Sequence, residues 1–198
     1  CATPRLLCAV VLAKLPFSTG STEAGKYAGN GYMGKVVVSN INQTNSTGII
    51  GTSDYVKIKD LTLTNIIDVR KKEYDGRSIL AENEDFLGTN PDFTHSIIEN
   101  LNIINLTHYV GSVNPTTYIK WRGQINRLFI DNIAFYKIEG TNGYYGNFIR
   151  ANVKNIVLMN SKMDSFDKIF NLTNQDVFLK EKDCSYFTQK LVETQIFL

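Results

Sequence analysis

Residues 56–66 read VKIKDLTLTNI, and this eleven-residue pattern returns along the chain. The further copies are SIIENLNIINL at 96–106, LFIDNIAFYKI at 128–138 and ANVKNIVLMNS at 151–161, with a weaker copy around Asn40. Each copy contains two runs of alternating apolar residues, and the alternation changes phase at the Asn or Asp in its fifth position. Successive strand residues point to opposite faces, so a change of phase indicates a corner. Asn and Asp suit corners because they tolerate left-handed backbone.

The fifth-position residues recur at unequal intervals. They are Asn40, Asp60, Asn100, Asn132 and Asn155. Unequal intervals are typical of a parallel β-helix, in which rungs keep their strands and vary their turns. A third strand per rung is predicted between the copies, at 48–51, 78–81, 118–121, 147–150 and 168–171. The sequence therefore predicts an all-β fold, a right-handed parallel β-helix (solenoid) of about five rungs.

A second set of Asn residues lies five positions after the corners. Its members are Asn65, Asn105 and Asn160, and Lys137 takes the equivalent place in the third copy. Asn side chains stacked on successive rungs can form a hydrogen-bonded ladder. We interpret this set as structural and not as a ligand site.

The segments outside the repeats are predicted to close the solenoid. Thr3 and Pro4 form a good helix start, and apolar residues from Leu6 to Leu15 recur at helical spacing. We expect a short N-terminal capping helix and not a signal peptide, because no initiator Met and no small-residue cleavage site accompany this stretch. The expected organisation is a cap and loop over 1–30, a β-helix over 31–180 and a C-terminal cap or tail over 181–198, as one domain.

Composition excludes several classes of function. The net charge is +2, which does not indicate nucleic acid or an anionic membrane as partner. No apolar stretch reaches the ~20 residues of a transmembrane helix. Cys1, Cys8 and Cys184 lack metal-ligand spacing, and we interpret them as buried or idle thiols, with a bridge between two of them left open.

The repeats resemble those of right-handed parallel β-helix proteins of the pectate-lyase-like superfamily, over about residues 32–178. The stretch INRLFIDNIAFYKI at 125–138 is similar to a phrase found in β-helix surface proteins of gut Bacteroidetes, and 147–156 continues the likeness. The resemblance implies an exported protein, extracellular or on the cell surface, that is associated with polysaccharide. It is more specific for fold than for activity, because the pattern records packing.

Aromatic residues near the long turns suggest a sugar-binding surface. Sugar rings stack on aromatic side chains while polar groups bind their hydroxyls. Tyrosines lie in or beside these turns at Tyr109, Tyr118, Tyr136, Tyr144 and Tyr145. Alternation predicts that Trp121 faces the core and that Tyr118 and Arg122 face outward. The predicted ligand-binding residues are Tyr118, Arg122, Tyr144, Tyr145 and Arg150.

Acidic turns offer weaker candidates for catalysis. By the resemblance, β-helix lyases use carboxylates that hold Ca²⁺ together with an Arg or Lys, and hydrolases use clustered carboxylates. Carboxylates expected on turns are Asp68, Glu73, Asp75, Glu82, Glu84, Asp85 and Asp92. The densest group, Glu82, Glu84 and Asp85 with Arg77 nearby, is the candidate catalytic set. It lacks a recognised calcium spacing, so we favour a solvated acidic turn and expect no cofactor, with Ca²⁺ as the alternative.

These observations leave three hypotheses. The first is an exported module that binds a polysaccharide or assists its processing. The second is a structural or adhesive segment, as in phage tailspikes and surface adhesins, which would form a homo-oligomer through an exposed apolar stripe. The third and weakest is a polysaccharide lyase or glycoside hydrolase, which needs converging carboxylates. A binding module should instead show a groove with aromatics and no catalytic cluster.

Overall fold

The computed structural model describes residues 10–12, 31–44, 50–52, 56–70, 80–82, 97–111, 117–141, 145–163, 166–172 and 178–184. Almost all of these residues lie in strands, and no helix occurs among them. The strands are β1 (Val10–Leu12), β2 (Gly31–Thr44), β3 (Ile50–Thr52), β4 (Val56–Arg70), β5 (Leu80–Glu82), β6 (Ile97–Val110), β7 (Thr117–Lys137), β8 (Tyr145–Met159), β9 (Phe166–Leu172) and β10 (Phe178–Lys182).

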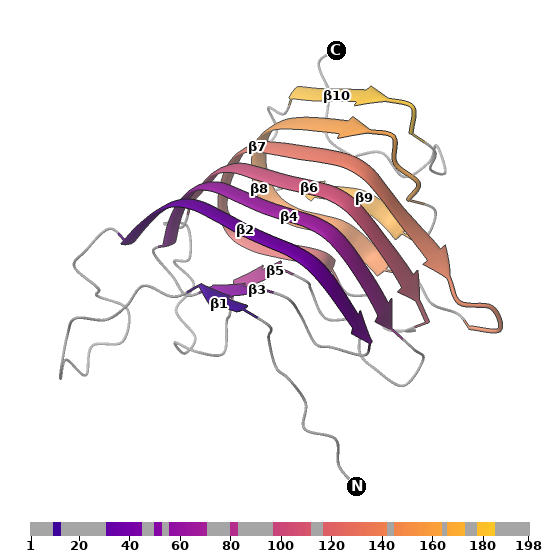
Figure 1. The fold of residues 1–198 in the computed structure, drawn as a ribbon. Coiled ribbons are helices and arrows are strands. Elements are labelled where there is room, and N and C mark those ends of the chain that lie inside the picture. The colour runs from indigo at the N-terminus through magenta and orange to yellow at the C-terminus, as the bar shows by residue number, and fades with distance from the viewer. Residues whose placement is uncertain are drawn as a thin grey trace, which may run out of the picture.

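The strands stack in parallel, coil upon coil. The long strands β4, β6, β7 and β8 follow one another in sequence order and make about three turns of a parallel β-solenoid (Figure 1). Strand β2 pairs with β4 at one end of this stack, and β10 pairs with β8 at the other. The all-β parallel solenoid predicted from the repeats is confirmed, whereas the count of five rungs is not.

A second set of stacked parallel strands lies between the long strands in sequence. It contains β1, β3, β5 and the beginning of β7, followed by the beginning of β8 and β9. The predicted third strand of each rung is therefore confirmed where the structure describes it. The N-terminal capping helix is not confirmed. Of its predicted residues, 10–12 form the parallel strand β1, and the others lie outside the described residues.

Equivalent inward residues of successive coils fill the core. Leu61, Leu101, Leu128 and Ile156 are register partners on neighbouring strands, and each is at most 1% exposed. Burying one such side chain stabilises the fold by about 1.5–3 kcal/mol. Trp121 is also buried, as the alternation predicted. The repeat therefore exists because each coil covers the apolar face of the next.

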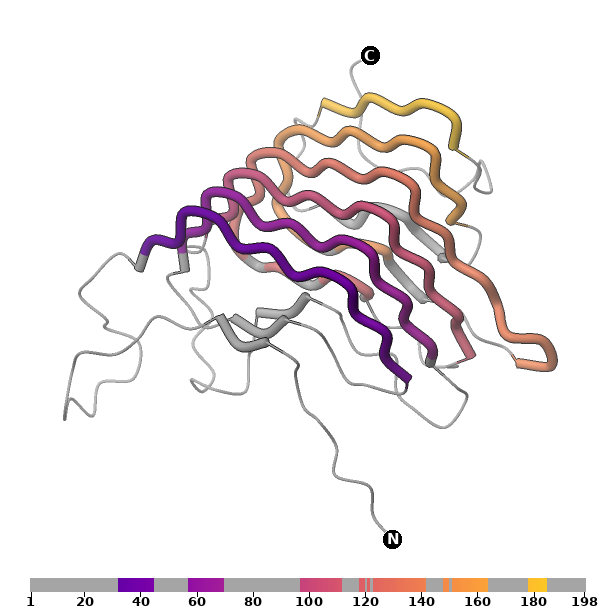
Figure 2. The backbone as a smooth tube through the Cα atoms, viewed as in Figure 1, coloured from indigo at the N-terminus to yellow at the C-terminus, as the bar shows by residue number. Residues whose placement is uncertain are grey.

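The long strands bend at matching places along the stack (Figure 2). At one bend the backbone is left-handed in every coil: φ is 59° at Asn40, 55° at Asn65, 55° at Asn105, 52° at Asn132, 48° at Asn160 and 53° at Asp183. Neighbouring register pairs place these residues in one column, which we call the corner column. Asn occupies it because the left-handed conformation costs other non-glycine residues about 1–2 kcal/mol.

The five predicted corner residues lie at two different bends. Asn40 and Asn132 lie in the corner column, whereas Asp60, Asn100 and Asn155 lie five residues upstream, at a second bend, and have no left-handed backbone. The register pairs Asn100 with Arg127, so the third copy was aligned five residues out of step. The misalignment arises because each coil has two bends five residues apart. Both bends interrupt the apolar alternation, so the sequence pattern around one bend resembles the pattern around the other.

The predicted Asn ladder is confirmed, with one change of membership. The Nδ2 of Asn65 donates to Oδ1 of Asn40 at 3.2 Å, and Asn105 donates to Asn65 at 3.1 Å. Asn132, and not Lys137, continues the ladder by donating to Asn105 at 2.8 Å. Asn160 leaves it and donates to Oδ1 of Asp131 at 2.8 Å.

The displaced Asn residues have a separate role at the upstream bend. Lys59 and Asp60 both point away from the core, between the buried Ile58 and Leu61, so the alternation does change phase there. Asn100 donates from Nδ2 to the Lys59 carbonyl at 3.4 Å. Asn155 likewise donates to the Asn126 carbonyl at 3.2 Å. These amides therefore satisfy carbonyl groups at the bend of the preceding coil.

Candidate functional site

The acidic candidates lie mostly outside the described residues. Glu82 ends β5, where its backbone is paired with Thr52, and its side chain is not described. Arg77, Glu84 and Asp85 lie outside the described residues. Among the residues that are described, no three His, Cys, Asp or Glu side chains gather as a metal site. The catalytic and calcium hypotheses for the acidic turn therefore stay predictions.

The outward orientation predicted for Tyr118 is wrong. Its side chain has no exposed surface, and the next residue, Ile119, is equally buried. Two consecutive inward residues break the alternation on which the prediction relied; Phe148 and Ile149 repeat the break in the next coil. A buried ring is not available to stack on a sugar outside the core. The side chains of Arg122, Tyr145 and Arg150, and the whole of Tyr144, lie outside the described residues.

Asp68 was expected on a turn but is fully buried near the end of β4. Its Oδ2 lies 2.9 Å from Nδ1 of His108 and accepts a hydrogen bond from the Tyr118 hydroxyl at 3.3 Å. Gln43 donates from Nε2 to the other carboxylate oxygen at 2.9 Å. Gln43, Asp68 and His108 are register partners on neighbouring strands, so the solenoid stacks them, with Asp68 and His108 in the core and Gln43 half-buried beside them.

Aromatic rings enclose this polar cluster. The His108 ring lies 4.9 Å from the Tyr118 ring and 5.2 Å from the Phe135 ring, measured between centroids. Phe135 in turn packs edge-on against Phe148 at 5.8 Å. Neither Asp68 nor His108 has exposed surface, so no external substrate reaches them. We therefore assign the cluster to structural stabilisation.

An open depression lies on the outer face of β4, β6 and β7, upstream of the corner column. Its volume is about 400 Å³. The lining residues, which together define the depression, are Asp60, Asn100, Asn102, Ile104, Arg127 and Phe129. Register pairs align Asp60, Asn100 and Arg127 across the three coils, and Asn102 with Phe129 beside them. The depression thus has a polar side and a partly apolar side.

The polar side alternates acceptors and donors. Asn100 donates from Nδ2 to Oδ1 of Asp60 at 2.9 Å. On β7, Arg127 takes the position that Asn100 has on β6, and its side chain is exposed. Within the described part of the chain, the Arg127 guanidinium makes no ion pair or hydrogen bond. Its fork of donors is therefore available to a ligand oxygen.

The other side combines an aromatic ring with an amide. Ile104 and Phe129 are half-buried and provide apolar contact surface. Asn102 donates from Nδ2 to the Thr62 hydroxyl at 3.3 Å, on the coil of β4. The Asn102 Nδ2 is engaged in this bond, which leaves its Oδ1 as an acceptor in the depression. A ligand in the depression therefore meets a ring and an acceptor together.

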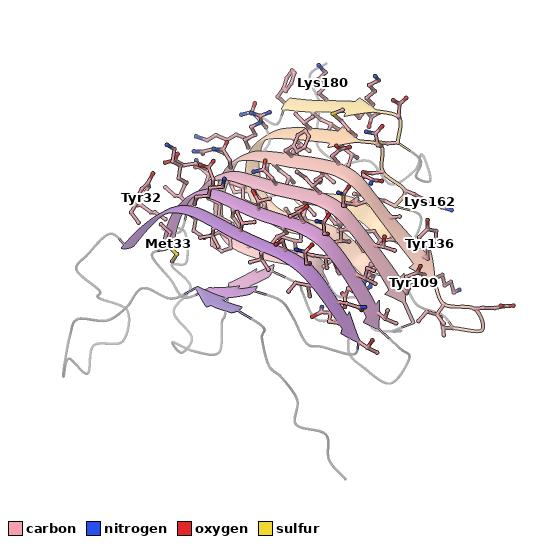
Figure 3. All side chains as sticks on the ribbon, viewed as in Figure 1. Tyr32, Met33, Tyr109, Tyr136, Lys162 and Lys180 are labelled. Atoms are coloured by element: carbon pink, nitrogen blue, oxygen red, sulfur yellow. The ribbon has the colours of Figure 1, made fainter. Side chains whose placement is uncertain are left out.

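Two tyrosines project from β6 and β7 beyond the corner column, as labelled in Figure 3. Tyr109 and Tyr136 are register partners, each 40% exposed, with ring centroids 5.5 Å apart and planes at 26°. Carbon atoms in contact lie about 3.5–4.0 Å apart, so a 5.5 Å separation means that the rings are offset and keep part of their faces open. Lys162 lies over Tyr136, with Nζ 5.4 Å from the ring centroid.

Sequence reasoning singled out both tyrosines but missed the depression. The signal for the depression is an Arg in a column whose other members are Lys35, Asp60, Asn100, Asn155 and Phe178, and it appears only once the coils are in correct register.

Fold and site together define a parallel β-solenoid with an open, half-polar depression and an exposed tyrosine pair on its outer face. Comparisons of the chain with protein-family models, with curated proteins and with solved structures gave no match. The resemblance to pectate-lyase-like and Bacteroidetes surface proteins therefore stays a prediction. Within the described strands and turns, no helix is long and apolar enough to span a membrane.

Proposed function

We propose that this solenoid is an exported polysaccharide-binding module and that the depression on β4, β6 and β7 holds the sugar. The observation that carries the proposal is that Arg127 and Phe129 of β7 line the depression together with Asp60 and Asn102. Sugar units present hydroxyls at their edges and C–H groups on their faces. A site with a few polar groups around an apolar surface matches this chemistry.

Each lining group has a definite role in this proposal. The Arg127 guanidinium donates to hydroxyl or ring oxygens, while Asp60 and the Asn102 carbonyl accept from hydroxyls. The Phe129 ring contacts a C–H face. The ladder of hydrogen bonds from Asn100 to Asp60 and from Asn102 to Thr62 holds the acceptors in place before a ligand arrives. Such preorganisation lowers the entropy cost of binding.

The depression favours binding over glycoside hydrolysis. Hydrolysis of a glycosidic bond ordinarily needs two carboxyl groups, about 5–9.5 Å apart across the scissile bond. Of the described residues that line the depression, only Asp60 carries a carboxylate. This supports an accessory role for the depression, with the acidic turn around Glu82 as the place to seek catalysis if products form.

The test is affinity electrophoresis of the purified chain in gels containing xylan, dextran, β-glucan, polygalacturonate or alginate. Sugar release is assayed in parallel, with and without Ca²⁺. We expect retardation by at least one polysaccharide without product. Arg127→Ala should weaken binding about ten- to a hundredfold, since hydrogen bonds to a charged group contribute about 1.5–3 kcal/mol. Phe129→Ala should weaken it in the same direction.

Two residues of the same outer face provide matched controls. Lys154 is an exposed cation on β8, and Phe178 is a 54% exposed phenylalanine on β10; neither lines the depression. Lys154→Ala and Phe178→Ala should bind like the wild type, and urea midpoints should show that all variants are folded. No retardation by any polysaccharide would reject the proposal in favour of a structural or adhesive role, to be followed by the oligomeric mass. Equal binding by all four variants would reject the depression as the site.

Product release would instead identify an enzyme. Substitution of Arg77, Glu82, Glu84 and Asp85 would then show whether the acidic turn carries the reaction.

A further inference from the structure

We infer that one polysaccharide chain lies along β6 and β7 and crosses the corner column, so that the depression and the Tyr109–Tyr136 pair bind the same chain. The inference rests on the proposed function and adds the direction and the minimum length of the ligand. It gives the tyrosine pair a role as a second subsite.

The two features share the same pair of strands. In the depression, Asn102 of β6 is the register partner of Phe129 of β7. Beyond the corner, Tyr109 of β6 is the partner of Tyr136 of β7. Both pairs point away from the core. A chain that leaves the depression along the strand direction therefore meets the tyrosines next.

The corner between them is polar and exposed. Asn105 and Asn132 are the corner residues of β6 and β7, and both are exposed. In the ladder, Asn132 donates to Asn105 and Asn105 donates to Asn65. Each amide carries two N–H groups, and one N–H of each suffices for these bonds. The second N–H of each can bind a sugar hydroxyl, so the corner itself offers polar contacts to the chain.

A chain running along the solenoid axis would not use both features. Along the axis, the column that holds the tyrosines continues as Val69 and Thr44 on the coils before them. The column of Phe129 continues as Thr62 on one side and Val157 on the other. Among the described residues, aromatic side chains on both sides of the corner occur together on β7, as Phe129 and Tyr136, with Tyr109 of β6 beside Tyr136. This coincidence points to a ligand that follows the strands.

The geometry sets a length requirement. Phe129 and Tyr136 are seven residues apart on β7, which is at most about 23 Å of extended strand. The bend shortens the straight path, but a disaccharide in the depression still does not reach the tyrosines. An oligosaccharide of several units does. Short and long ligands should therefore differ in their dependence on Tyr109 and Tyr136.

The experiment is isothermal titration calorimetry with the disaccharide and the octasaccharide of xylan, of β-1,4-glucan and of polygalacturonate. The variants are Arg127→Ala, the double variant Tyr109→Ala/Tyr136→Ala, and the control Tyr32→Ala. Tyr32 is a 58% exposed tyrosine on β2. Arg127→Ala should weaken both ligands. The double tyrosine variant should weaken the octasaccharide about tenfold and leave the disaccharide unchanged, while Tyr32→Ala should change neither.

The outcomes separate the two proposals. A longer chain offers more binding registers, so tighter binding of the octasaccharide by the wild type is not decisive by itself. The decisive result is weaker binding of the octasaccharide by the double tyrosine variant. If the tyrosine variant binds the octasaccharide like the wild type while Arg127→Ala weakens it, the shared path is wrong and the depression stands. If the wild type binds neither ligand of any series, both proposals fall. Intrinsic fluorescence and urea midpoints confirm that each variant is folded.

Discussion

Asp68 and His108 face each other inside the solenoid, with the carboxylate Oδ2 2.9 Å from the imidazole Nδ1 and no exposed surface on either side chain. The pair lies on neighbouring strands, β4 and β6. Gln43 and Tyr118 complete the surroundings of the carboxylate. Burying a carboxylate costs free energy unless hydrogen bonds and ion pairs replace its lost contacts with water. The cluster therefore joins the coils of β2, β4 and β6 inside the solenoid.

The first prediction concerns this cluster. Asp68→Ala removes the shared acceptor and leaves buried polar groups behind, so it should destabilise the fold by about 3–5 kcal/mol. Urea denaturation followed by circular dichroism measures the change. Glu99→Gln is the control, because Glu99 is a half-buried carboxylate on the outer side of β6 and should change stability by less than about 0.5 kcal/mol. Equal effects of the two substitutions would show that the cluster does not stabilise the protein.

The second prediction concerns the corner column. Asn105→Ala places an alanine at φ 55° and removes two ladder bonds, to Asn65 and from Asn132. The left-handed strain costs about 1–2 kcal/mol and each hydrogen bond about 0.5–1.5 kcal/mol, which gives a loss of about 2–5 kcal/mol.

Asn105→Gly separates the two contributions, because glycine adopts the left-handed conformation freely but cannot join the ladder. It should cost less than Asn105→Ala, and Asn42→Ala, at an exposed position on β2, should cost little. The midpoints of urea unfolding give the order. If glycine proves more harmful than alanine at this position, backbone strain is not the reason for Asn.

The third prediction concerns the exposed ring pair. Offset stacking contributes about 0.5–1.5 kcal/mol beyond area burial, so Tyr109→Ala and Tyr136→Ala should be coupled by about that amount in a double-mutant cycle. The measurement is the unfolding free energy of the wild type, both single variants and the double variant. The cycle of Tyr32→Ala with Tyr136→Ala serves as the control and should show no coupling. Additive effects of Tyr109 and Tyr136 would mean that the rings do not stack in solution.

The fourth prediction concerns Cys184, which is a free thiol. Partial burial raises its pKa above the usual 9.0, helped by the negative charges of Glu181 and Asp183 and opposed by hydrogen bonds to the backbone. The neutral thiol is the favoured form, so alkylation by iodoacetamide should be slow at neutral pH. Its rate should reach half of its maximum at a higher pH in the folded chain than in urea. Cys1→Ser/Cys8→Ser isolates this thiol for the measurement.

The sign for stability follows from the same shift. A group whose pKa is raised by folding stabilises the fold below its unfolded pKa, and the contribution is lost as the pH rises through the folded pKa. The Cys184→Ser variant should therefore lack any pH dependence that this thiol confers in the alkaline range. A thiol in the folded chain that titrates below the thiol of the unfolded chain would contradict the prediction.

Much of the fold was readable from local residues. The alternating runs around Leu61 and Leu101 determine which side chains face the core, because strand residues alternate. The Asn residues determine where the chain bends, because few other residues accept left-handed backbone. Even the ladder followed from the spacing of Asn65 and Asn105. These features depend on near neighbours in the chain, which is why the sequence contained them.

Other features depended on which residue of one coil faces which residue of the next. The five-residue ambiguity around Asn132 was resolved only by pairing of whole strands. The correct register also brings together the residues that lie three positions after the corner residues. These are Gln43 after Asn40, Asp68 after Asn65 and His108 after Asn105, which are register partners on β2, β4 and β6.

The sequence by itself determined a stack of parallel strands with Asn at its bends, because that information lies in local periodicity and backbone preference. Only the tertiary structure decided that Asp68 meets His108, that Tyr118 points inward to Asp68 and that Arg127 borders one depression with Asp60 and Asn100. These relationships join residues that are distant in the chain. They follow from inter-coil register, which is set by the summed packing of all coils and not by any single repeat.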